Sequence, residues 1–575
     1  MKNYEIAWIL LEYADLLDLT GENPFKARAY RRAARQLEQL SQPVTELNRQ
    51  GRLTEINGVG STISNQIAEL LATGSIAAME SLKKQVPSGL FTVLTVPGVG
   101  PIRAHLFYQE LGITSLAELE EAARKRQLRK LKGIGNKVEA TILDGIRRLT
   151  DPQFSQRLPL ALADEYADLL ISRLNLTPEV VEVAVAGSLR RRVETVGDLD
   201  LLVATQAPED VGAFFRSFPE FTKILTAGLT KISAYHRGGF QVDLQMVLPN
   251  QFPAALAHFT GSKEHNIRLR QLAKAKNYRL NEYGFQNLKA EGSDFLPTSE
   301  AELFNFIELP FIEPELREDR GEIEAAQAGE LPQLITVTDI QGDLHIHSRW
   351  SDGLATIEEI ARAAAARGYS YIAICDHSQS LSIAKGLTFQ RLQAQRQEIA
   401  NLNQHGDLGI FILSGIEVDI LNDQLDFPDA VLAEADVVVA SIHSGFKQPP
   451  ETIMSRIELA LRNPHVDILA HPTGRLLGRR AGYAIDLDRI IDLAVETQTA
   501  LEINAFPDRL DLDDRSTRQA LERGAMVVIN SDSHRLEHLD NMRYGVSVAR
   551  RAWAEPHQIL NCRNLQGLRE WLTSR

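Results

Sequence analysis

The chain has 575 residues, more than one hydrophobic core usually sustains, so its length predicts three or more domains. It is 44% apolar and 24% charged, as globular proteins are, and no apolar run approaches the ~20 residues that would cross a bilayer. The only two cysteines, Cys375 and Cys562, exclude a disulfide framework and a zinc site made of thiolates, and they fit a reducing cytoplasm.

The net charge of −14 is distributed unevenly along the chain. Residues 1–150 contain 20 Lys and Arg against 16 Asp and Glu, so this part is +4 and the remainder is −18. A positive segment suits a nucleic-acid backbone, whereas acidic regions can gather the carboxylates that divalent cations require. The distribution is compatible with metal-dependent work on a polyanion.

Residues 1–150 are predicted to form short helices separated by glycine-containing turns, without a strand. Three turns have an apolar residue between two glycines, and each is followed by a helical segment. Such glycines let the backbone come close to a phosphate, toward which the first N–H groups of the next helix point. The pattern resembles the helix-hairpin-helix element, which grips DNA without reading sequence. The predicted DNA-binding residues are Gly58, Gly60, Gly98, Gly100, Gly133 and Gly135, with Lys26 from a basic cluster.

Short β-branched runs between residues 180 and 250 predict strands of one sheet. Gly187 and Ser188 follow the first run. A tight turn there can place backbone N–H groups, the Ser188 hydroxyl and Arg191 around a triphosphate.

Three aspartates of the same region are predicted to form a catalytic triad. Asp198 and Asp200 are two residues apart on one predicted strand and therefore share a face, and Asp243 lies on another strand. Three carboxylates are what two Mg²⁺ ions need if one is to activate a 3′-hydroxyl and the other to hold the leaving pyrophosphate.

The sequence resembles family X DNA polymerases, the group that contains polymerase beta. The motifs that carry the resemblance occur in the same order as in that family: GSLRRR and GDLD (187–200), the lone Asp243, the FTGS turn (259–262) and the NEYG run (281–284). The resemblance covers residues 1 to about 310. It implies Mg²⁺ or Mn²⁺ on the three aspartates, with dNTPs and gapped or primed DNA as substrates. The further nucleotide contacts that it implies are Phe259, Gly261, Asn266 and Arg270.

Four positions depart from the family pattern. Thr62 and Gln66 stand where the members with lyase activity carry lysines, and without an amine no Schiff base with an abasic sugar forms there. We therefore expect the polymerase-beta type of lyase activity to be absent or to use another residue. His258 stands where Tyr is frequent beside the sugar, and Gln241 where Arg commonly precedes the third aspartate, so the resemblance leaves selection against ribonucleotides open.

From residue 339 onward, apolar strands alternate with helices at least seven times, which predicts a parallel sheet closed into a barrel. Nine histidines and acidic residues lie where predicted strands give way to loops, and in such a barrel these ends converge on one face. A mixed imidazole and carboxylate set suits Zn²⁺, Mn²⁺ or Fe²⁺. The nine predicted ligands are His345, His347, Asp352, His377, Glu417, His443, His471, Asp532 and His534.

The motifs HIHSRWSD, SGIEVD, SIHS, AHP and SDSH resemble those of the PHP phosphoesterases over residues 340–540. The resemblance implies up to three ions, Mn²⁺ or Zn²⁺, with Glu417 bridging two of them. One ion would be held by His345, His347, Glu417 and Asp532, a second by Glu417, His443 and His471, and a third by Asp352, His377 and His534.

The predicted fold is multidomain, α+β and α/β: a helix-hairpin-helix region, a nucleotidyltransferase palm with a mixed sheet, and a distorted (βα)7 barrel. The predicted domains are 1–85 and 86–150 for DNA binding, 151–255 for the palm, 256–312 for nucleotide binding, 313–338 as a linker and 339–575 for the PHP domain.

The function expected from these features is gap filling in base excision repair by a cytoplasmic monomer without a membrane partner. The second half would act as a 3′–5′ exonuclease, and 3′-phosphatase or abasic-site endonuclease activity is also compatible with it. Three alternatives remain open: nucleotidyl transfer to a non-DNA acceptor, a small-molecule PHP phosphatase, and a non-catalytic DNA-binding scaffold.

Overall fold

The computed structural model describes residues 3–38, 44–56, 58–94, 96, 99–131, 133–150, 157–289, 292–405 and 407–574. The chain divides into two compact units, Met1–Gln156 and Arg157–Arg575. In these ranges no helix has the length and apolar character needed to cross a membrane.

The first unit is helical, as predicted, and the structure assigns no strand to its described residues. Its core consists of apolar side chains at helical spacing, among them Ile6, Leu10, Ile67 and Phe107, all fully buried. The elements are α1 (Asn3–Leu19), α2 (Pro24–Glu38), α3 (Val44–Arg49), η1 (Leu53–Glu55), α4 (Ser61–Thr73), α5 (Ala77–Lys83), α6 (Ser88–Val93), α7 (Pro101–Leu111), α8 (Leu116–Arg124), η2 (Leu128–Lys130) and α9 (Asn136–Thr150).

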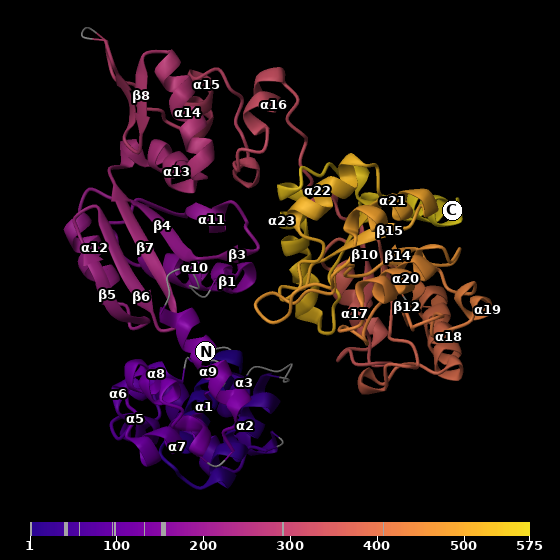
Figure 1. The fold of residues 1–575 in the computed structure, drawn as a ribbon, viewed down its shortest axis with the longest axis horizontal. Helices are drawn as coiled ribbons and strands as arrows, with labels where there is room; N and C mark the ends of the chain where they lie inside the picture. Colours follow the sequence, from indigo (N-terminus) through magenta and orange to yellow (C-terminus); the bar gives the residue numbers. More distant parts are fainter. Residues whose placement is uncertain are drawn as a thin grey trace. The chain divides into compact units, whose positions relative to one another are not determined.

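The second unit begins with a five-stranded mixed sheet in the order β2-β4-β7-β6-β5 (Figure 1). The three β-branched runs of the sequence form β2, β4 and β7, while β5 and β6 are additional. The elements here are β1 (Leu158–Pro159), α10 (Leu160–Leu174), β2 (Glu182–Val185), α11 (Gly187–Arg190), β3 (Thr195–Val196), β4 (Asp198–Ala204), α12 (Pro208–Arg216), β5 (Phe221–Ala227), β6 (Lys231–His236) and β7 (Phe240–Val247).

A helical layer with a small hairpin follows the sheet and surrounds its own aromatic core, which includes Phe285 and Phe304. Its elements are η4 (Pro249–Gln251), α13 (Phe252–Thr260), α14 (Lys263–Ala275), β8 (Tyr278–Asn281), β9 (Gly284–Asn287) and α15 (Glu300–Phe306).

Residues 313–338 differ from the linker predicted from their composition. They form η5 (Pro314–Leu316), α16 (Glu322–Ala328) and η6 (Val337–Asp339). Arg317, 1% exposed, donates to Glu300 at 2.7 Å and lies over the rings of Phe304 and Phe311. Glu322 lies 2.7 Å from His265, and both are fully buried. Buried polar pairs, together with Leu316, Ile323 and Leu334 in the neighbouring apolar core, thus order a segment whose low hydrophobicity indicated a linker.

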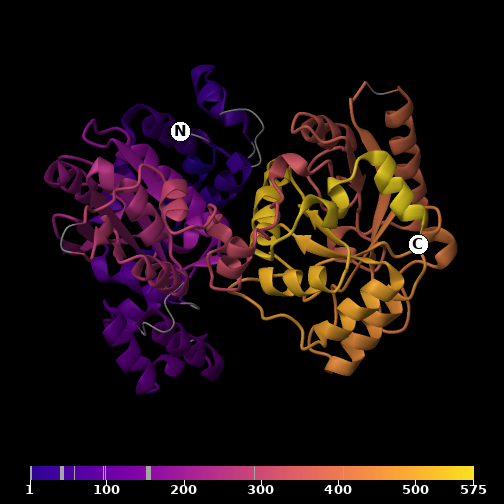
Figure 2. The same ribbon diagram turned by 90° about the horizontal axis from the view of Figure 1, so that it is seen from above.

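The rest of the chain forms a nearly closed barrel of seven parallel strands in the order β10 to β16, as predicted. A bridge between Ile346 and Ser533 joins the first strand to the segment after the last one. The strands β10, β13 and β15 are buried along their whole length, as parallel strands covered by helices are, and Figure 2 shows the helices outside the barrel.

The strands of the barrel are β10 (Gly342–Ile346), β11 (Tyr371–Ile374), β12 (Phe411–Asp419), β13 (Val437–Ser441), β14 (Ile468–Leu469), β15 (Ala500–Asn504) and β16 (Val527–Asn530). The remaining elements are α17 (Ile357–Ala365), η7 (Ser382–Ala384), α18 (Phe389–His405), α19 (Asp429–Leu432), α20 (Pro450–Leu461), α21 (Leu487–Thr497), α22 (Asp514–Glu522), η8 (Leu536–Asn541), α23 (Met542–Arg551), η9 (Pro556–Gln558), η10 (Leu560–Cys562) and α24 (Leu565–Thr573).

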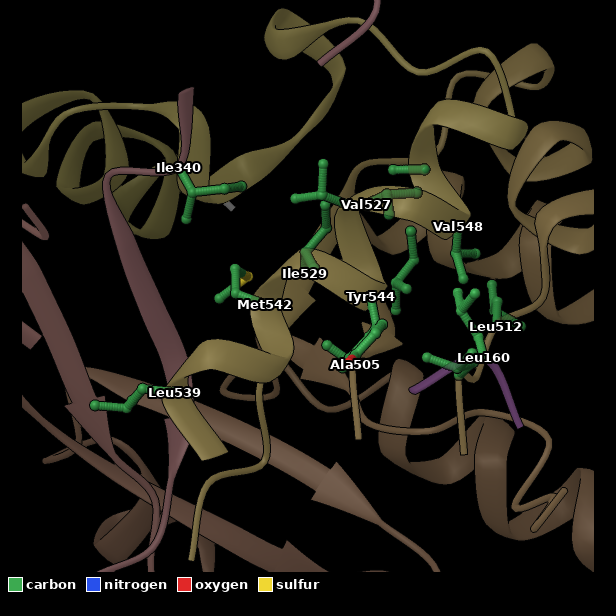
Figure 3. Packing of buried hydrophobic residues seen from close by; sticks show 14 of the residues in the cluster. Leu160, Ile340, Ala505, Leu512, Val527, Ile529, Leu539, Met542, Tyr544 and Val548 are labelled. Carbon is green, nitrogen blue, oxygen red and sulfur yellow. The ribbon is translucent and has the colours of Figure 1, made fainter. Parts of the chain in front are cut away.

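Within the second unit the sheet region packs directly on the barrel. One hydrophobic cluster contains Leu160 of α10 together with Leu512, Tyr544 and Val548 of the barrel. Figure 3 shows Leu160 beside Leu512 and Val548. The two halves of this unit therefore share a core.

Candidate functional site

The three aspartates predicted as a triad come together on one face of the five-stranded sheet, on its neighbouring inner strands β4 and β7. β4 and β7 are parallel neighbours, with Asp200 opposite Asp243 and Asp198 two residues before it on the same face. One carboxylate oxygen from each lies within 4.8 Å of the others, a spacing that suits a shared cation. Burial raises the pKa of Asp200 to about 7, and the Asp198 and Asp243 carboxylates contribute to the rise. A divalent cation would relieve this repulsion.

Gly187 brings the predicted phosphate-binding turn against the triad. Its φ is +56°, a left-handed conformation that favours glycine, and Ala186 N–H donates to the Asp200 carbonyl at 2.9 Å. A Cβ at this position would lie 2.0 Å from Asp200 Oδ2. Ser188, half-buried in α11, follows directly. The turn and the carboxylates are therefore parts of one site.

Two side chains that contact Asp243 were not found by sequence reasoning. Lys231 Nζ of β6 lies 2.8 Å from Asp243 Oδ2, and Gln241 Nε2 donates to Asp243 Oδ1 at 2.8 Å. In the sequence Gln241 stands out only as a departure from the family pattern. Lys231 brings a positive charge to Asp243 from the neighbouring strand β6. Residue spacing along a single strand cannot indicate a contact between two strands.

The remaining predicted nucleotide contacts lie on α13, α14 and the turn between them. Gly261 ends α13 at a φ of +70°, and a Cβ there would lie 3.1 Å from Arg191 Nη1. Asn266 donates to the His258 carbonyl at 2.7 Å and lines a small pocket with His258 and exposed Arg270. The Phe259 ring lies edge-on to His258 at 5.0 Å. Arg191 and the FTGS turn are thus brought together, 69 residues apart in the chain.

The hairpin glycines of the first unit have the conformations that the predicted DNA contacts require. Gly58 and Gly133 are left-handed, at φ of +84° and +83°. Gly60 and Gly100 immediately precede α4 and α7, and Gly135 precedes α9. A Cβ added at any of these three would have no atom of the described residues within 4 Å, so the backbone is open to a ligand there. Gly98 lies outside the described residues.

The basic cluster and the lyase positions of this unit are partly engaged with other side chains. Lys26 pairs with Glu22 at 3.1 Å on the surface, and Arg31 pairs with Asp15 and Asp18. Gln66 accepts a hydrogen bond from Tyr30, so it is a structural partner of that hydroxyl.

The nine predicted ligands of the barrel converge around Glu417 of β12. Its Oε1 lies 3.4 Å from Nε2 of both His443 and His471 and 3.5 Å from Nε2 of His345. Its Oε2 lies 2.7 Å from His377 Nδ1 and 3.6 Å from His347 Nε2. One buried carboxylate therefore faces five imidazoles.

The outer part of this cluster is formed by Asp352 and Asp532. Asp352 Oδ2 lies 3.5 Å from Nε2 of His377 and of His534, and Asp532 Oδ1 lies 3.2 Å from His347 Nε2. The closest groupings differ from the three predicted sets, since His347 also approaches Asp352 and His534 while His377 approaches Glu417 and His443.

Several buried ligand atoms fit a bound cation. Among the described residues, Glu417 Oε1, His347 Nδ1 and both ring nitrogens of His471 have no hydrogen-bond partner. Burial lowers the pKa of His347 to about 4 and of His443 to about 3, so both are the neutral imidazoles that bind metals. Burial alone would raise the pKa of Glu417, but the surrounding histidines hold it well below its usual range.

A shell of buried polar residues, missed by sequence reasoning, orients these ligands. Glu502 Oε1 lies 2.8 Å from His345 Nδ1, and Asn504 donates to Asp532 at 3.0 Å. Arg509 Nε lies 3.7 Å from Asp532 Oδ2 and is a cation at the edge of the cluster. Glu502 and Asn504 alternate with apolar residues along β15. This pattern is common to strands with one polar face, so it does not single the two residues out in the sequence.

This architecture defines a class of protein: a nucleotidyltransferase with helix-hairpin-helix elements, joined to a metal-dependent phosphoesterase. Family models match the chain as a helix-hairpin-helix domain (residues 1–76), a SAM-like helix-hairpin-helix tandem (91–148), a DNA polymerase beta thumb (255–318) and a PHP domain (343–505).

Similarity to known proteins extends over the full chain. The sequence is 42% identical to the DNA polymerase/3′–5′ exonuclease PolX of Bacillus subtilis (strain 168) over 575 residues, which cover 100% of this chain and 99% of that one. It is 25% identical to DNA polymerase lambda of Rattus norvegicus over 51% of this chain and 52% of that one. A protein of Thermoanaerobacter sp. (strain X514) named "Probable phosphatase" is 28% identical over 38% of this chain and 89% of its own length.

The chain therefore belongs to the bacterial-type family X DNA polymerases that carry a C-terminal PHP domain, and it is a DNA polymerase with 3′–5′ exonuclease activity.

Proposed function

We propose that the polymerase fills short gaps during DNA repair, base excision repair in particular, and that its catalytic groups are Asp198, Asp200 and Asp243. The observation that carries this proposal is the meeting of the three carboxylates against the Gly187 turn, in a chain whose N-terminal unit matches a helix-hairpin-helix domain. No comparable observation favours nucleotidyl transfer to an acceptor other than DNA.

The polymerase residues have distinct proposed roles. The three aspartates would hold Mg²⁺ or Mn²⁺, which when bound supplies the positive charge that nucleotidyl transfer requires. The Gly187 turn, the Ser188 hydroxyl and Arg191 would bind the phosphates of a dNTP. Phe259 and Gly261 would lie against its sugar, and Asn266 and Arg270 would contact the nucleotide and the template side.

The barrel is proposed to remove nucleotides from the 3′ end that the polymerase extends. Up to three ions, Mn²⁺ or Zn²⁺, would be held by the nine ligands, and when bound they supply the charge that activates water and neutralises a phosphodiester. Glu417, which faces five imidazoles, would be the shared ligand. We also propose 3′-phosphates and abasic sites as substrates, because the likeness to a probable phosphatase covers this half.

The DNA interface is proposed to be the hairpin surface of the first unit. The domain boundaries predicted from the sequence are proposed as well. Gly58, Gly60, Gly100, Gly133 and Gly135 would let the DNA backbone approach, and Lys26 would add a phosphate contact. Because each site is built from residues of one chain, we propose that a monomer is active. Cytoplasm is the proposed compartment, since DNA is the substrate of both activities.

A gapped-duplex assay tests these proposals. Duplex DNA with a one-nucleotide gap, incubated with dNTPs and Mg²⁺, should be extended by the wild type and not by Asp198→Ala. Glu417→Ala should abolish 3′–5′ degradation and leave extension intact. Extension by Asp198→Ala, or degradation by Glu417→Ala, would refute the corresponding site. Duplexes that end in a 3′-phosphate or contain an abasic site test the additional substrates.

A further inference from the structure

A buried ion-pair network joins the phosphate-binding turn of the polymerase half to helix α23 of the barrel, within Arg157–Arg575. Arg191 Nε donates to Glu318 Oε1 at 3.0 Å. Arg551 Nη1, at the end of α23, donates to the same oxygen at 2.9 Å. Two arginines, one from each half of this unit, therefore share one carboxylate oxygen.

The shared carboxylate is held in a poorly solvated place. The side chains of Arg551, Arg191 and Glu318 are 5%, 14% and 16% exposed. Arg551 also donates to the Arg191 carbonyl at 2.8 Å and pairs with Asp514 at 2.9 Å. Because bulk water screens these charges weakly, their interactions are stronger than those of surface pairs.

The geometry leaves part of Arg191 available for a ligand. Glu318 engages Nε and the Thr260 carbonyl accepts from Nη1, while in the described part of the chain no hydrogen bond joins Nη2 to another residue. A guanidinium fixed in this way presents its remaining N–H groups with little loss of freedom, as recognition of a phosphate requires.

Charge balance gives Arg551 a specific task. Glu318 paired with Arg191 alone would cancel the positive charge that a triphosphate needs. With Arg551 on the same oxygen, the group of Arg191, Glu318 and Arg551 keeps a net positive charge, because the Asp514 carboxylate that also pairs with Arg551 is balanced by Arg320 at 2.9 Å. Burial by itself would raise the pKa of Glu318, but the two arginines lower it, so the carboxylate stays ionised.

We propose that Glu318 and Arg551 are positioning residues for nucleotide binding: Glu318 fixes the Arg191 guanidinium, and Arg551 offsets the charge of Glu318. A residue of the exonuclease barrel would thus set the affinity of the polymerase site for dNTPs. The inference rests on the proposed role of Arg191 as a phosphate ligand.

Single-turnover extension of a gapped duplex tests the inference, because it gives the Kd for dNTP and the extension rate separately. Arg551→Met is expected to raise the Kd about five- to tenfold, the lower range of couplings between sites. The extension rate and the nuclease rate should stay within about twofold, which separates the effect from general damage. Arg551→Gln, which keeps hydrogen-bond donors without the charge, should give the same increase, and Arg551→Lys should restore most of the affinity.

Arg550→Met is the matched control. Arg550 precedes Arg551 on α23 and pairs with Glu315 at 2.7 Å, and no hydrogen bond or ion pair joins it to Glu318, Asp514 or Arg191 in the described ranges. It should leave the Kd for dNTP unchanged while lowering the melting temperature, because it too removes an ion pair between α23 and the segment 313–338. An equal rise in Kd for this control would overturn the inference.

The decisive comparison is made in a Glu318→Gln background. There the charge that Arg551 offsets is gone, so adding Arg551→Met should change the Kd by less than about twofold. A full increase in that background would refute the inference. Arg191→Met distinguishes failure of the proposed phosphate-binding role of Arg191 from failure of the positioning role of Arg551. If Arg191→Met leaves the Kd for dNTP unchanged, the role of Arg191 fails. If Arg191→Met raises the Kd strongly while Arg551→Met does not, only the positioning role is rejected.

Discussion

Replacing Gly187 by alanine tests how tightly the phosphate-binding turn and the triad are coupled. The new Cβ would lie 2.0 Å from Asp200 Oδ2 and 3.0 Å from its Cγ, and real Cβ atoms essentially never approach other atoms closer than 3.0 Å. Either the carboxylate or the turn must therefore move by about 1 Å or more. The left-handed conformation costs alanine a further ~1–2 kcal/mol.

We expect catalysis to be lost through displacement of the Asp200 carboxylate, which we propose as a catalytic group. Asp200 lies on β4, which is paired on both sides by β2 and β7, and its carbonyl accepts from Ala186 N–H at 2.9 Å. The strand cannot recede, so the carboxylate itself must rotate away from Asp198 and Asp243. A misplacement of about 1 Å at a catalytic group lowers the rate about 100-fold, and we expect that loss in the extension rate of Gly187→Ala.

Single-turnover extension of gapped DNA measures this loss, with the nuclease rate of the same preparation as internal control. Gly197→Ala is the matched variant: it stands beside Asp198 and has no left-handed φ. Among the described residues, its Cβ would meet only the flexible end of Arg157, at 3.3 Å. It should retain extension within about threefold. The reasoning is wrong if Gly187→Ala extends as fast as Gly197→Ala, or if its nuclease rate falls in parallel.

Three further predictions concern the other sites. Glu502→Gln removes the carboxylate that orients His345, so the Mn²⁺ concentration for half-maximal nuclease activity should rise about 10- to 100-fold. Extension should be unchanged, and an unaltered Mn²⁺ requirement would contradict the orienting role. Borohydride trapping with an incised abasic duplex should give no covalent adduct on α4, because Thr62 and Gln66 carry no amine, and mass spectrometry of any adduct would identify another nucleophile. Lys26→Met should reduce the salt dependence of DNA binding by about one unit in the slope of log K against log salt; an unchanged slope would remove Lys26 from the interface.

Site features that depend on a single strand or a single turn could be predicted from local patterns in the sequence. Asp198 and Asp200 share a face because strand side chains alternate, and Gly187 follows β2 at the point where a turn must begin. The nine barrel ligands lie after predicted strands, and parallel strands bring those ends together. Repeated βα units likewise predicted the barrel, which is confirmed.

Other site features depend on contacts between distant segments, which no spacing reveals. Lys231 reaches Asp243 across two antiparallel strands, and one of them, β6, was not predicted. Glu502 reaches His345 over 157 residues. In each case the residue type is common on surfaces, so only the fold distinguishes it from a solvated side chain.

The segment 313–338 shows why composition misled. Low hydrophobicity predicts a linker when charged side chains are assumed to stay in water, but here they find partners on both neighbouring halves. Arg317 is buried between aromatic rings and Glu300, and Glu318 lies between Arg191 and Arg551. A hydrophobic connector would also bury surface, but it could not form the ion pairs of Glu318 through which we propose that Arg551 acts on Arg191. The charged residues of this segment are therefore what the proposed link between Arg551 and the nucleotide turn requires, and the ion pairs of Glu318 are where that proposal can be tested.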